Sequence, residues 1–182
     1  MNDKAEKVYA EAFFELCLEE SSDKLNDILG ELSALDGIFR EEPDFVKLLG
    51  TPTVPMSEKL GMIKDIIADG VTEYTGNLLC ILTERGRMGC FSGIVKNFRA
   101  LYNEHFRIAE ITVTASAPLS ESVREQIRAK MSEVTGKTVS IKEKVDPSII
   151  GGVVIDYGST RYDGSVRARL NELKRELGGV IA

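Results

Sequence analysis

Apolar residues up to about His105 recur every three or four positions, which is the period of an amphipathic helix. Six such stripes follow one another, with turn residues between them. They comprise Val8, Ala12, Phe13, Leu16 and Cys17; Leu25, Ile28, Leu29, Leu32 and Leu35; Phe45, Val46, Leu48 and Leu49; a fourth stripe from Ser57 to Ile67; a fifth from Val71 to Glu84; and Met88, Phe91, Ile94 or Val95, Phe98 and Leu101. Six short helices joined by tight loops predict a compact bundle.

Turn residues predict where several of these helices begin and end. Asp36-Gly37 is expected near the end of the second helix, and Gly50 closes the third. The segment Thr51–Pro55 cannot be helix interior, because proline lacks the amide donor and clashes with the preceding turn. Ser57 is the expected N-cap of the fourth helix, and Asp69-Gly70 separates that helix from the fifth.

After Phe106 the apolar pattern changes from the helical period to runs and alternation typical of strands. Three strands are predicted, at Ile108–Thr114, Thr138–Val145 and Ile149–Ile155. Ser120 can cap a helix between the first two strands, and a last helix places Val166, Leu170, Leu173 and Leu177 on one stripe. The expected fold class is therefore α+β and mostly α, with a six-helix bundle over residues 1–105 and a small α/β domain over residues 106–182.

The first helix carries more apolar surface than one core requires. At roughly 100° per residue, its apolar residues between Val8 and Cys17 spread over about 240° of the circumference, leaving a narrow remainder to Lys7, Glu11, Glu15 and Glu19. A helix that covers a single core needs an apolar arc of only ~100° or somewhat more. The helix is therefore either central in the bundle or buried on a second side by a partner.

Composition and charge are those of a globular protein that avoids nucleic acid. The chain has 182 residues, of which 43% are hydrophobic and 29% charged, and no apolar run approaches the ~18 residues of a membrane-spanning helix. Residues 1–105 carry 19 acids against 11 bases, and residues 106–182 carry 10 acids against 12 bases. A first half of this sign repels phosphate backbones, so a nucleic-acid partner is not expected. Met1–Lys7 lacks the apolar core of a secretory signal, which favours a cytosolic location.

The sequence offers little that could hold a metal or cofactor. Cys17, Cys80 and Cys90 are odd in number and share no short spacing, and His105 is the only histidine. A disulfide framework is usually even, and zinc ligands are usually closely paired. We therefore expect three reduced, partly buried thiols, no metal site and no cofactor.

One segment, Thr135–Thr138, resembles the end of a phosphate-binding loop. That motif requires a further glycine five residues before Gly136, where this chain has Met131. A helix C-cap glycine followed by a strand is the simpler interpretation. No serine or cysteine stands in a nucleophile-elbow setting. The residues alone therefore indicate no catalytic site, although the absence of a motif does not exclude an enzyme.

The C-terminal third resembles a known family signature. The run Asp146–Ile155, then Gly158, then Asp163–Val166 with the later leucines, is similar to the signature of the delta subunit of F-type ATP synthase, whose mitochondrial counterpart is the oligomycin-sensitivity-conferring protein. The N-terminal half agrees, since Tyr9–Leu16 resembles the family's opening helix. Further matches are Leu48-Leu49 with Pro52 and Lys59, and Asn77–Leu79 with Arg85–Arg87. The Tyr157–Ser159 turn departs from the family, where an acid often follows the glycine.

The resemblance implies a non-catalytic stator subunit that tethers the catalytic head of the enzyme to its membrane sector. It implies that residues 1–105 grip the amphipathic N-terminal helix of an alpha subunit between the first and fifth helices. The matching positions here are Tyr9, Ala12, Phe13, Leu16, Leu78 and Leu82. The C-terminal domain would hold the C-terminal end of the b subunit through the segment Asp163–Leu177, at Asp163, Ser165, Val166, Leu170 and Leu173. In this interpretation Phe13→Asp weakens head binding and leaves the fold largely intact.

The same resemblance implies one copy per complex, a monomer when free, and a location at the cytoplasmic face of the bacterial membrane without insertion into it. Two other interpretations stay open on the residues alone. The chain could be an unrelated regulatory adaptor that binds some other helix. It could also be a nucleotide-dependent enzyme built on the C-terminal domain, for which Thr135–Thr138 is the only support.

Overall fold

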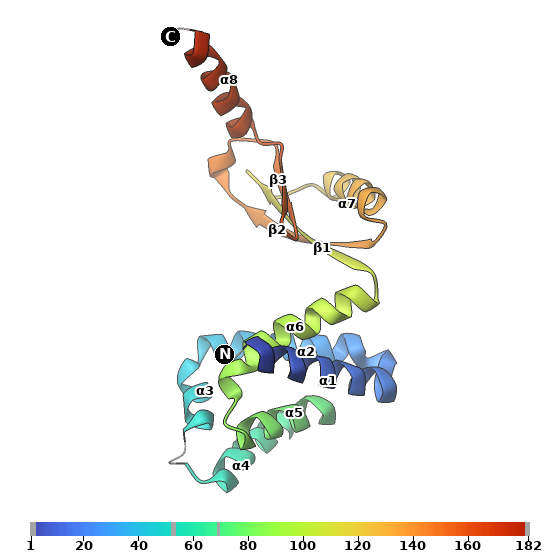
Figure 1. Ribbon diagram of the computed structural model, residues 1–182, viewed down its shortest axis with the longest axis vertical. Coiled ribbons are helices and arrows are strands. Elements are labelled where there is room, and N and C mark those ends of the chain that lie inside the picture. The colour runs from blue at the N-terminus through green and yellow to red at the C-terminus, as the bar shows by residue number, and fades with distance from the viewer. Residues whose placement is uncertain (1–2, 52–53, 69, 181–182) are drawn as a thin grey trace. The chain divides into compact units, whose positions relative to one another are not determined.

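The computed structural model describes residues 3–51, 54–68 and 70–180, apart from the side chains of 65–68 and 176–180. Expectations that fall on Pro52, on Asp69 and on the side chain of Leu177 lie outside the described residues. The chain divides into two compact units, Met1–Tyr102 and Asn103–Ala182, here called the N-terminal and C-terminal units (Figure 1).

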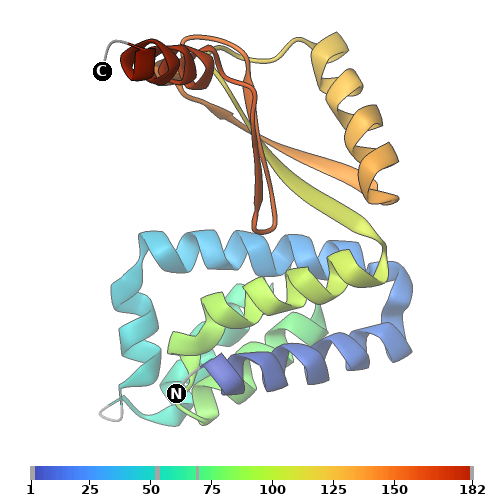
Figure 2. The same cartoon turned by 45° about the horizontal axis from the view of Figure 1, so that its top comes forward.

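The N-terminal unit is built from helices, in agreement with the predicted fold class. Its elements are α1 (Asp3–Ser21), η1 (Ser22–Lys24), α2 (Leu25–Glu41), α3 (Pro43–Gly50), α4 (Met56–Ala68), α5 (Glu73–Glu84), η2 (Met88–Cys90) and α6 (Phe91–His105). Here α denotes α-helices and η denotes 3₁₀ turns. The helix α6 lies between α1 and α2 (Figures 1 and 2).

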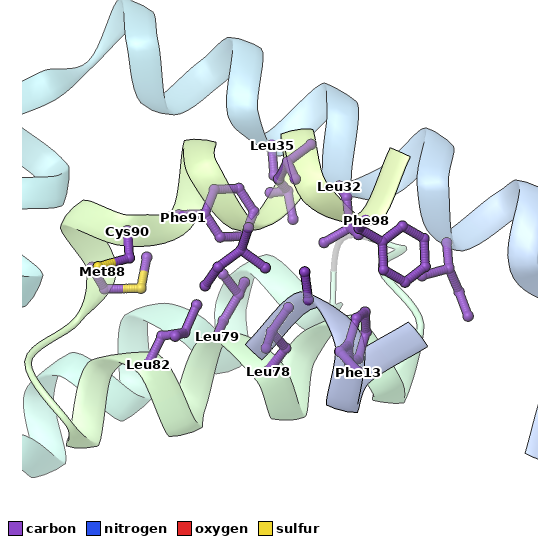
Figure 3. Close-up of a cluster of buried hydrophobic side chains, with 14 of the residues drawn as sticks. Phe13, Leu32, Leu35, Leu78, Leu79, Leu82, Met88, Cys90, Phe91 and Phe98 are labelled. Atoms are coloured by element: carbon purple, nitrogen blue, oxygen red, sulfur yellow. The ribbon is translucent and has the colours of Figure 1, made fainter. Parts of the chain in front are cut away.

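Aromatic rings organise the core of this unit around α6. The ring centroid of the fully buried Phe98 lies 5.5 Å from that of Phe13 and 5.4 Å from that of Phe14, both on α1. At the start of α6, Phe91 makes an edge-on contact with Phe39 of α2, at 5.1 Å between centroids. Leucines of α2 and α5 complete the cluster (Figure 3). Burying this apolar area is the main source of stability of the unit.

One helix runs a turn beyond the residues expected near its end, and one predicted N-cap is wrong. The helix α2 passes through Asp36-Gly37 and continues to Glu41. The last turn buries Phe39, which outweighs the roughly 1 kcal/mol that one glycine costs a helix. Arg40 supports the same turn through its Nη2, which lies 2.6 Å from Asp36 Oδ2. Ser57 does not cap the fourth helix either, because α4 already begins at Met56.

The C-terminal unit is a mixed four-stranded sheet with helices. Its elements are β1 (Ile108–Ala115), α7 (Glu121–Thr135), β2 (Thr138–Val145), η3 (Pro147–Ile149), β3 (Val153–Tyr157), β4 (Thr160–Asp163) and α8 (Val166–Val180). The strand order is β2-β1-β3-β4, with β1 parallel to β2 and the other pairs antiparallel. Ile111 and Val113 of β1 and Val139 of β2 pack with Met131 of α7 to form its core.

Local capping in this unit follows the sequence predictions. Ser120 is the N-cap of α7, with its hydroxyl accepting a hydrogen bond from the amide of Val123 at 3.4 Å. Gly136 is the C-cap, in the left-handed conformation with φ 65°. The segment Thr135–Thr138 is thus a helix end followed by the start of β2, as the simpler interpretation held.

The third strand begins four residues later in the structure than the sequence predicted. Pro147–Ile149 forms η3, Ile150 has φ 69°, and β3 starts only at Val153. The short strand β4 was not predicted, because its four residues are all exposed and show no alternation. It pairs with β3 across the two-residue turn at Gly158, where φ is 57°.

Candidate functional site

The helices α1 and α5 border an apolar groove of about 240 Å³ on the N-terminal unit. Each helix contributes four residues at the same i, i+3, i+4, i+7 spacing, which places them on one face. The lining residues are Tyr9, Ala12, Phe13 and Leu16 from α1, and Tyr74, Asn77, Leu78 and Ile81 from α5. Two helical faces in matching register form the walls that a third helix can occupy.

The groove has a buried floor and an exposed apolar rim. Phe13 and Leu78 are only 6% and 4% exposed, whereas Leu16 is 43% exposed and Ile81 is 46% exposed. Val8, also on α1, is 56% exposed but does not line the groove. The first helix is therefore not enclosed by the bundle, and its excess apolar surface faces the groove and solvent.

Hydrogen bonds hold the tyrosines at both ends of the groove. Arg87 Nη1 donates to Tyr9 Oη at 3.2 Å, and its guanidinium carbon lies 5.5 Å from the centre of the Tyr9 ring. At the other end Ser21 Oγ donates to Tyr74 Oη at 3.0 Å. Because these two tyrosine side chains are already held in place, they lose less conformational entropy when a partner binds.

The structure brings most of the predicted groove residues together, with one replacement. Tyr9, Ala12, Phe13, Leu16 and Leu78 all line the groove. Leu82 does not, because it is fully buried in the core of the unit (Figure 3). The neighbouring Ile81, about 100° away around the helix, faces the groove instead and was missed.

Phe13 belongs to the core as much as to the groove. Its side chain is 6% exposed, and its ring packs against Phe98. An aspartate at this position would place a carboxylate among aromatic rings, where an unpaired charge is very costly. We therefore expect Phe13→Asp to destabilise the fold as well as the groove. Substitutions of the exposed Leu16 and Ile81 test binding at the groove more cleanly.

The C-terminal unit has its own exposed apolar face on α8. Val166 is 40% exposed, Leu170 51% and Leu173 52%, at i, i+4, i+7 spacing along one stripe. The side chain of Leu177, the predicted continuation of this stripe, lies outside the described residues. Arg161, Arg167 and Arg175 border a polar cavity of about 390 Å³ alongside the start of this helix.

The two polar residues predicted to bind a partner here lie where β4 ends and α8 begins. Asp163 Oδ1 accepts a hydrogen bond from the amide of Ser165 at 3.0 Å, and hydrogen bonding with Ser165 is the main cause that lowers the pKa of Asp163. Ser165 is 2% exposed, and its hydroxyl accepts from the amide of Ala168 at 3.1 Å. This is N-cap geometry, so both residues orient the helix that exposes Val166, Leu170 and Leu173.

A second apolar cavity, of about 570 Å³, lies on the N-terminal unit between α2, α3 and Val71. Leu35, Ile38, Phe39 and Phe45 line it together with Val71. It is larger than the α1/α5 groove but lacks two long walls with matched helical spacing. Volume alone does not define a helix-binding groove, so the α1/α5 groove remains the better candidate.

The described residues do not assemble a metal site. No group of three or more histidine, cysteine, aspartate or glutamate side chains among them lies close enough to share a metal ion. Cys17, Cys80 and Cys90 are free thiols. Burial, aided by the Glu20 carboxylate, raises the pKa of Cys17 to about 11, so this thiol stays protonated and unreactive at neutral pH.

No helix within the described residues is long and apolar enough to cross a bilayer. The chain thus combines a helical unit with an open apolar groove and an α+β unit with an exposed apolar helix face. Residues 5–177 match the family described as ATP synthase delta (OSCP) subunit. The chain belongs to the ATP synthase delta/OSCP subunit family.

Curated relatives from bacteria and organelles agree with this assignment. The chain is 33% identical over 170 residues to ATP synthase subunit delta of Anaeromyxobacter sp. (strain Fw109-5), covering 93% of this chain and 94% of the relative. It is 33% identical over 173 residues to ATP synthase subunit delta, chloroplastic, of Emiliania huxleyi, covering 94% of this chain and 95% of the relative. The chain is therefore a non-catalytic, peripheral-stalk subunit of F-type ATP synthase, the complex that couples proton transport to ATP synthesis.

A solved structure shows the same fold at low sequence identity. A chain of the cryo-EM structure of the Toxoplasma gondii mitochondrial ATP synthase hexamer superposes with a TM-score of 0.70 and 20% identity. The match covers 94% of this chain and 96% of that chain.

Proposed function

We propose that the α1/α5 groove holds the amphipathic N-terminal helix of an alpha subunit, and that α8 contacts the C-terminal end of the b subunit. One copy of the chain would then join the catalytic head to the stator at the cytoplasmic face of the bacterial membrane. The observation that supports this proposal best is the groove itself, with its matched helical walls and exposed Leu16 and Ile81.

The groove suits a mechanical joint. Rotation of the central shaft exerts torque on the catalytic head, and a tether that resists it must dissociate slowly. Helix-in-groove burial of apolar side chains supports slow dissociation. The exposed Glu11, Glu15 and Glu19 follow one side of α1 and favour a partner helix with basic residues beside its apolar face.

The face of α8 suits an acidic amphipathic segment. Val166, Leu170 and Leu173 offer an exposed apolar stripe, while Arg167 and Arg175 add positive charge on the same helix. Apolar burial would contribute affinity, and the arginines would select for carboxylates on the partner. This charge pattern differs from that of the acidic α1 flank, so each face favours its own partner.

For the groove, we expect Leu16→Asp to weaken binding of the purified catalytic head by roughly 30-fold or more, because truncating a binding hot spot costs about 2 kcal/mol or more. Because Leu16 is 43% exposed, the variant should stay folded. Binding can be measured by surface plasmon resonance with immobilised head. The matched control is Val8→Asp, which adds the same charge on the same helix outside the groove. Equal loss in both variants would contradict the assignment of the groove.

For the second unit, we expect Leu170→Asp to weaken binding of a fragment from the C-terminal end of the b subunit by roughly 30-fold, on the same hot-spot reasoning. The control is Val134→Asp, which changes a 65% exposed valine on α7. Analytical ultracentrifugation of each variant with the fragment reports the affinity. Wild-type affinity in Leu170→Asp would remove α8 from the proposed interface.

A further inference from the structure

The helices α2 and α6 of the N-terminal unit border a polar cavity of about 500 Å³. Both helices lie side by side in Figure 2, and two hydrogen bonds join them. Arg99 Nη2 on α6 donates to Ser33 Oγ on α2 at 2.6 Å, and the Ser92 hydroxyl on α6 donates to Asp36 on α2. The cavity shares no residue with the α1/α5 groove.

Positive charge exceeds negative charge around this cavity. Arg40, Lys96 and Arg99 line it, against the carboxylate of Asp36 and that of Glu6, which lies beside Gly93 of the lining. The Asp36 carboxylate is already occupied, since it pairs with Arg40 at 2.6 Å and accepts from Ser92. Within the described part of the chain, no carboxylate lies within salt-bridge distance of Lys96 or Arg99. Two cations at the cavity are thus left without a carboxylate.

The positive charge at this cavity contrasts with the net negative charge of residues 1–105. Residues 1–105 carry 19 acids against 11 bases, so carboxylates are abundant and yet do not neutralise this cavity. Cations on neighbouring helices repel one another, and an anionic partner converts that repulsion into attraction. A local field of this sign in an acidic surface selects for a partner carrying the opposite charge.

We propose that this cavity receives acidic side chains from a segment of another protein chain of the ATP synthase complex. Lys96 and Arg99, the two cations without a carboxylate, are one turn apart on α6, and Arg40 of α2, paired with Asp36, lies beside the same cavity. Two cations spaced by one helical turn match carboxylates spaced along a chain better than they match one small anion. The volume agrees, because about 500 Å³ accommodates several side chains.

Carbodiimide cross-linking of the intact ATP synthase tests this contact, since the reagent joins a lysine amine to a carboxylate that touches it. We expect mass spectrometry to find Lys96 joined to an aspartate or glutamate of another protein of the complex. Lys47 provides the internal control, because its Nζ lies 2.8 Å from Asp44 Oδ1 in the same chain. Formation of the Lys47–Asp44 product without any product joining Lys96 to another protein would overturn the proposal, as would a Lys96 product confined to this chain.

Two variants distinguish the charge of Lys96 from the reactivity of its amine with carbodiimide. Lys96→Arg keeps the charge and should lose the cross-link while the protein stays in the complex. The double variant Lys96→Glu, Arg99→Glu should dissociate from the complex at least 10-fold faster at low salt, with the difference shrinking as salt rises. An unchanged dissociation rate would overturn the proposal. The proposal rests on the family assignment and not on the groove, so binding of an alpha-subunit peptide should be unaffected in the double variant.

Discussion

Replacing Phe98 by alanine is expected to lower the free energy of unfolding of the N-terminal unit by roughly 3–5 kcal/mol. Phe98 is fully buried, and its ring packs against both Phe13 and Phe14 of α1. Truncation removes the apolar surface of the ring and leaves a cavity that two fixed helices cannot close. Because Phe13 is also the floor of the groove, α1 should loosen and the groove should lose its shape.

Hydrogen exchange on the full chain is the suitable measurement, because two units need not unfold as one transition. Amides of α1 and α6 should exchange much faster in Phe98→Ala, while those of β1 and β3 should keep wild-type protection. Val8→Ala is the control, since surface changes usually stay within about 0.5 kcal/mol. Wild-type protection of α1 in Phe98→Ala would show that the aromatic cluster does not hold the bundle together.

Replacing Gly152 by alanine is expected to destabilise the C-terminal unit by roughly 2–4 kcal/mol, combining backbone strain with steric overlap. Gly152 has φ 76°, a conformation that L residues rarely adopt. An added Cβ would also overlap the carbonyl oxygen of Gly164, and would lie 3.1 Å from Ser165 Cα. The clash is with backbone, so it cannot be relieved by a side-chain rotation. The start of α8 should shift or fray as a result.

The matched control for this prediction is Gly136→Ala. Gly136 has φ 65° but no other atom within 4 Å of an added Cβ, so it isolates the strain of about 1–2 kcal/mol from the overlap. We expect the β3 and α8 amides to be much less protected from hydrogen exchange in Gly152→Ala than in Gly136→Ala. Equal protection in the two variants would mean that the overlap with the Gly164 backbone does not contribute to the loss of stability.

This close approach joins the two halves of the C-terminal motif. Gly164 donates its amide to the Val153 carbonyl at 3.0 Å, and Val166 donates to the Gly151 carbonyl at 2.9 Å. The two halves of the motif, near residue 150 and near residue 164, therefore meet in space. Residues such as Gly152 and Ser165 specify how α8 leaves the sheet, whereas the residues proposed to touch a partner lie further along the helix.

The sequence predicted what depends on short-range spacing. Helical stripes, the Ser120 cap, the Gly136 C-cap and the strand at β2 all follow from residues close in the chain. The end of α2 could not be predicted in this way, because it depends on burying Phe39 against α6, more than 50 residues away. Similarly, β4 is stabilised by pairing with β3, and its own residues give no strand signal.

The candidate groove was predicted in outline and missed in one detail. The wide apolar arc of the first helix left open whether that helix is central or covered by a partner, and the position of the groove came from the family resemblance. In the structure Leu16 is exposed at the groove while Ala10 and Cys17 are buried. On α5 the apolar residues run together in sequence, so periodicity does not say which side faces the core. Only packing decides that Leu82 points inward and Ile81 toward the groove.

The proposed role of the N-terminal unit requires the α1/α5 groove to bind an alpha-subunit helix. Calorimetric titration with a synthetic peptide from the N-terminus of the organism's own alpha subunit tests it most directly. We expect tight binding by the wild type, loss in Ile81→Asp, and full affinity in Ile38→Asp. Ile38 is 54% exposed and lines the second apolar cavity, so this pair distinguishes the two surfaces. Absence of binding by the wild type, or loss in Ile38→Asp alone, would contradict the account.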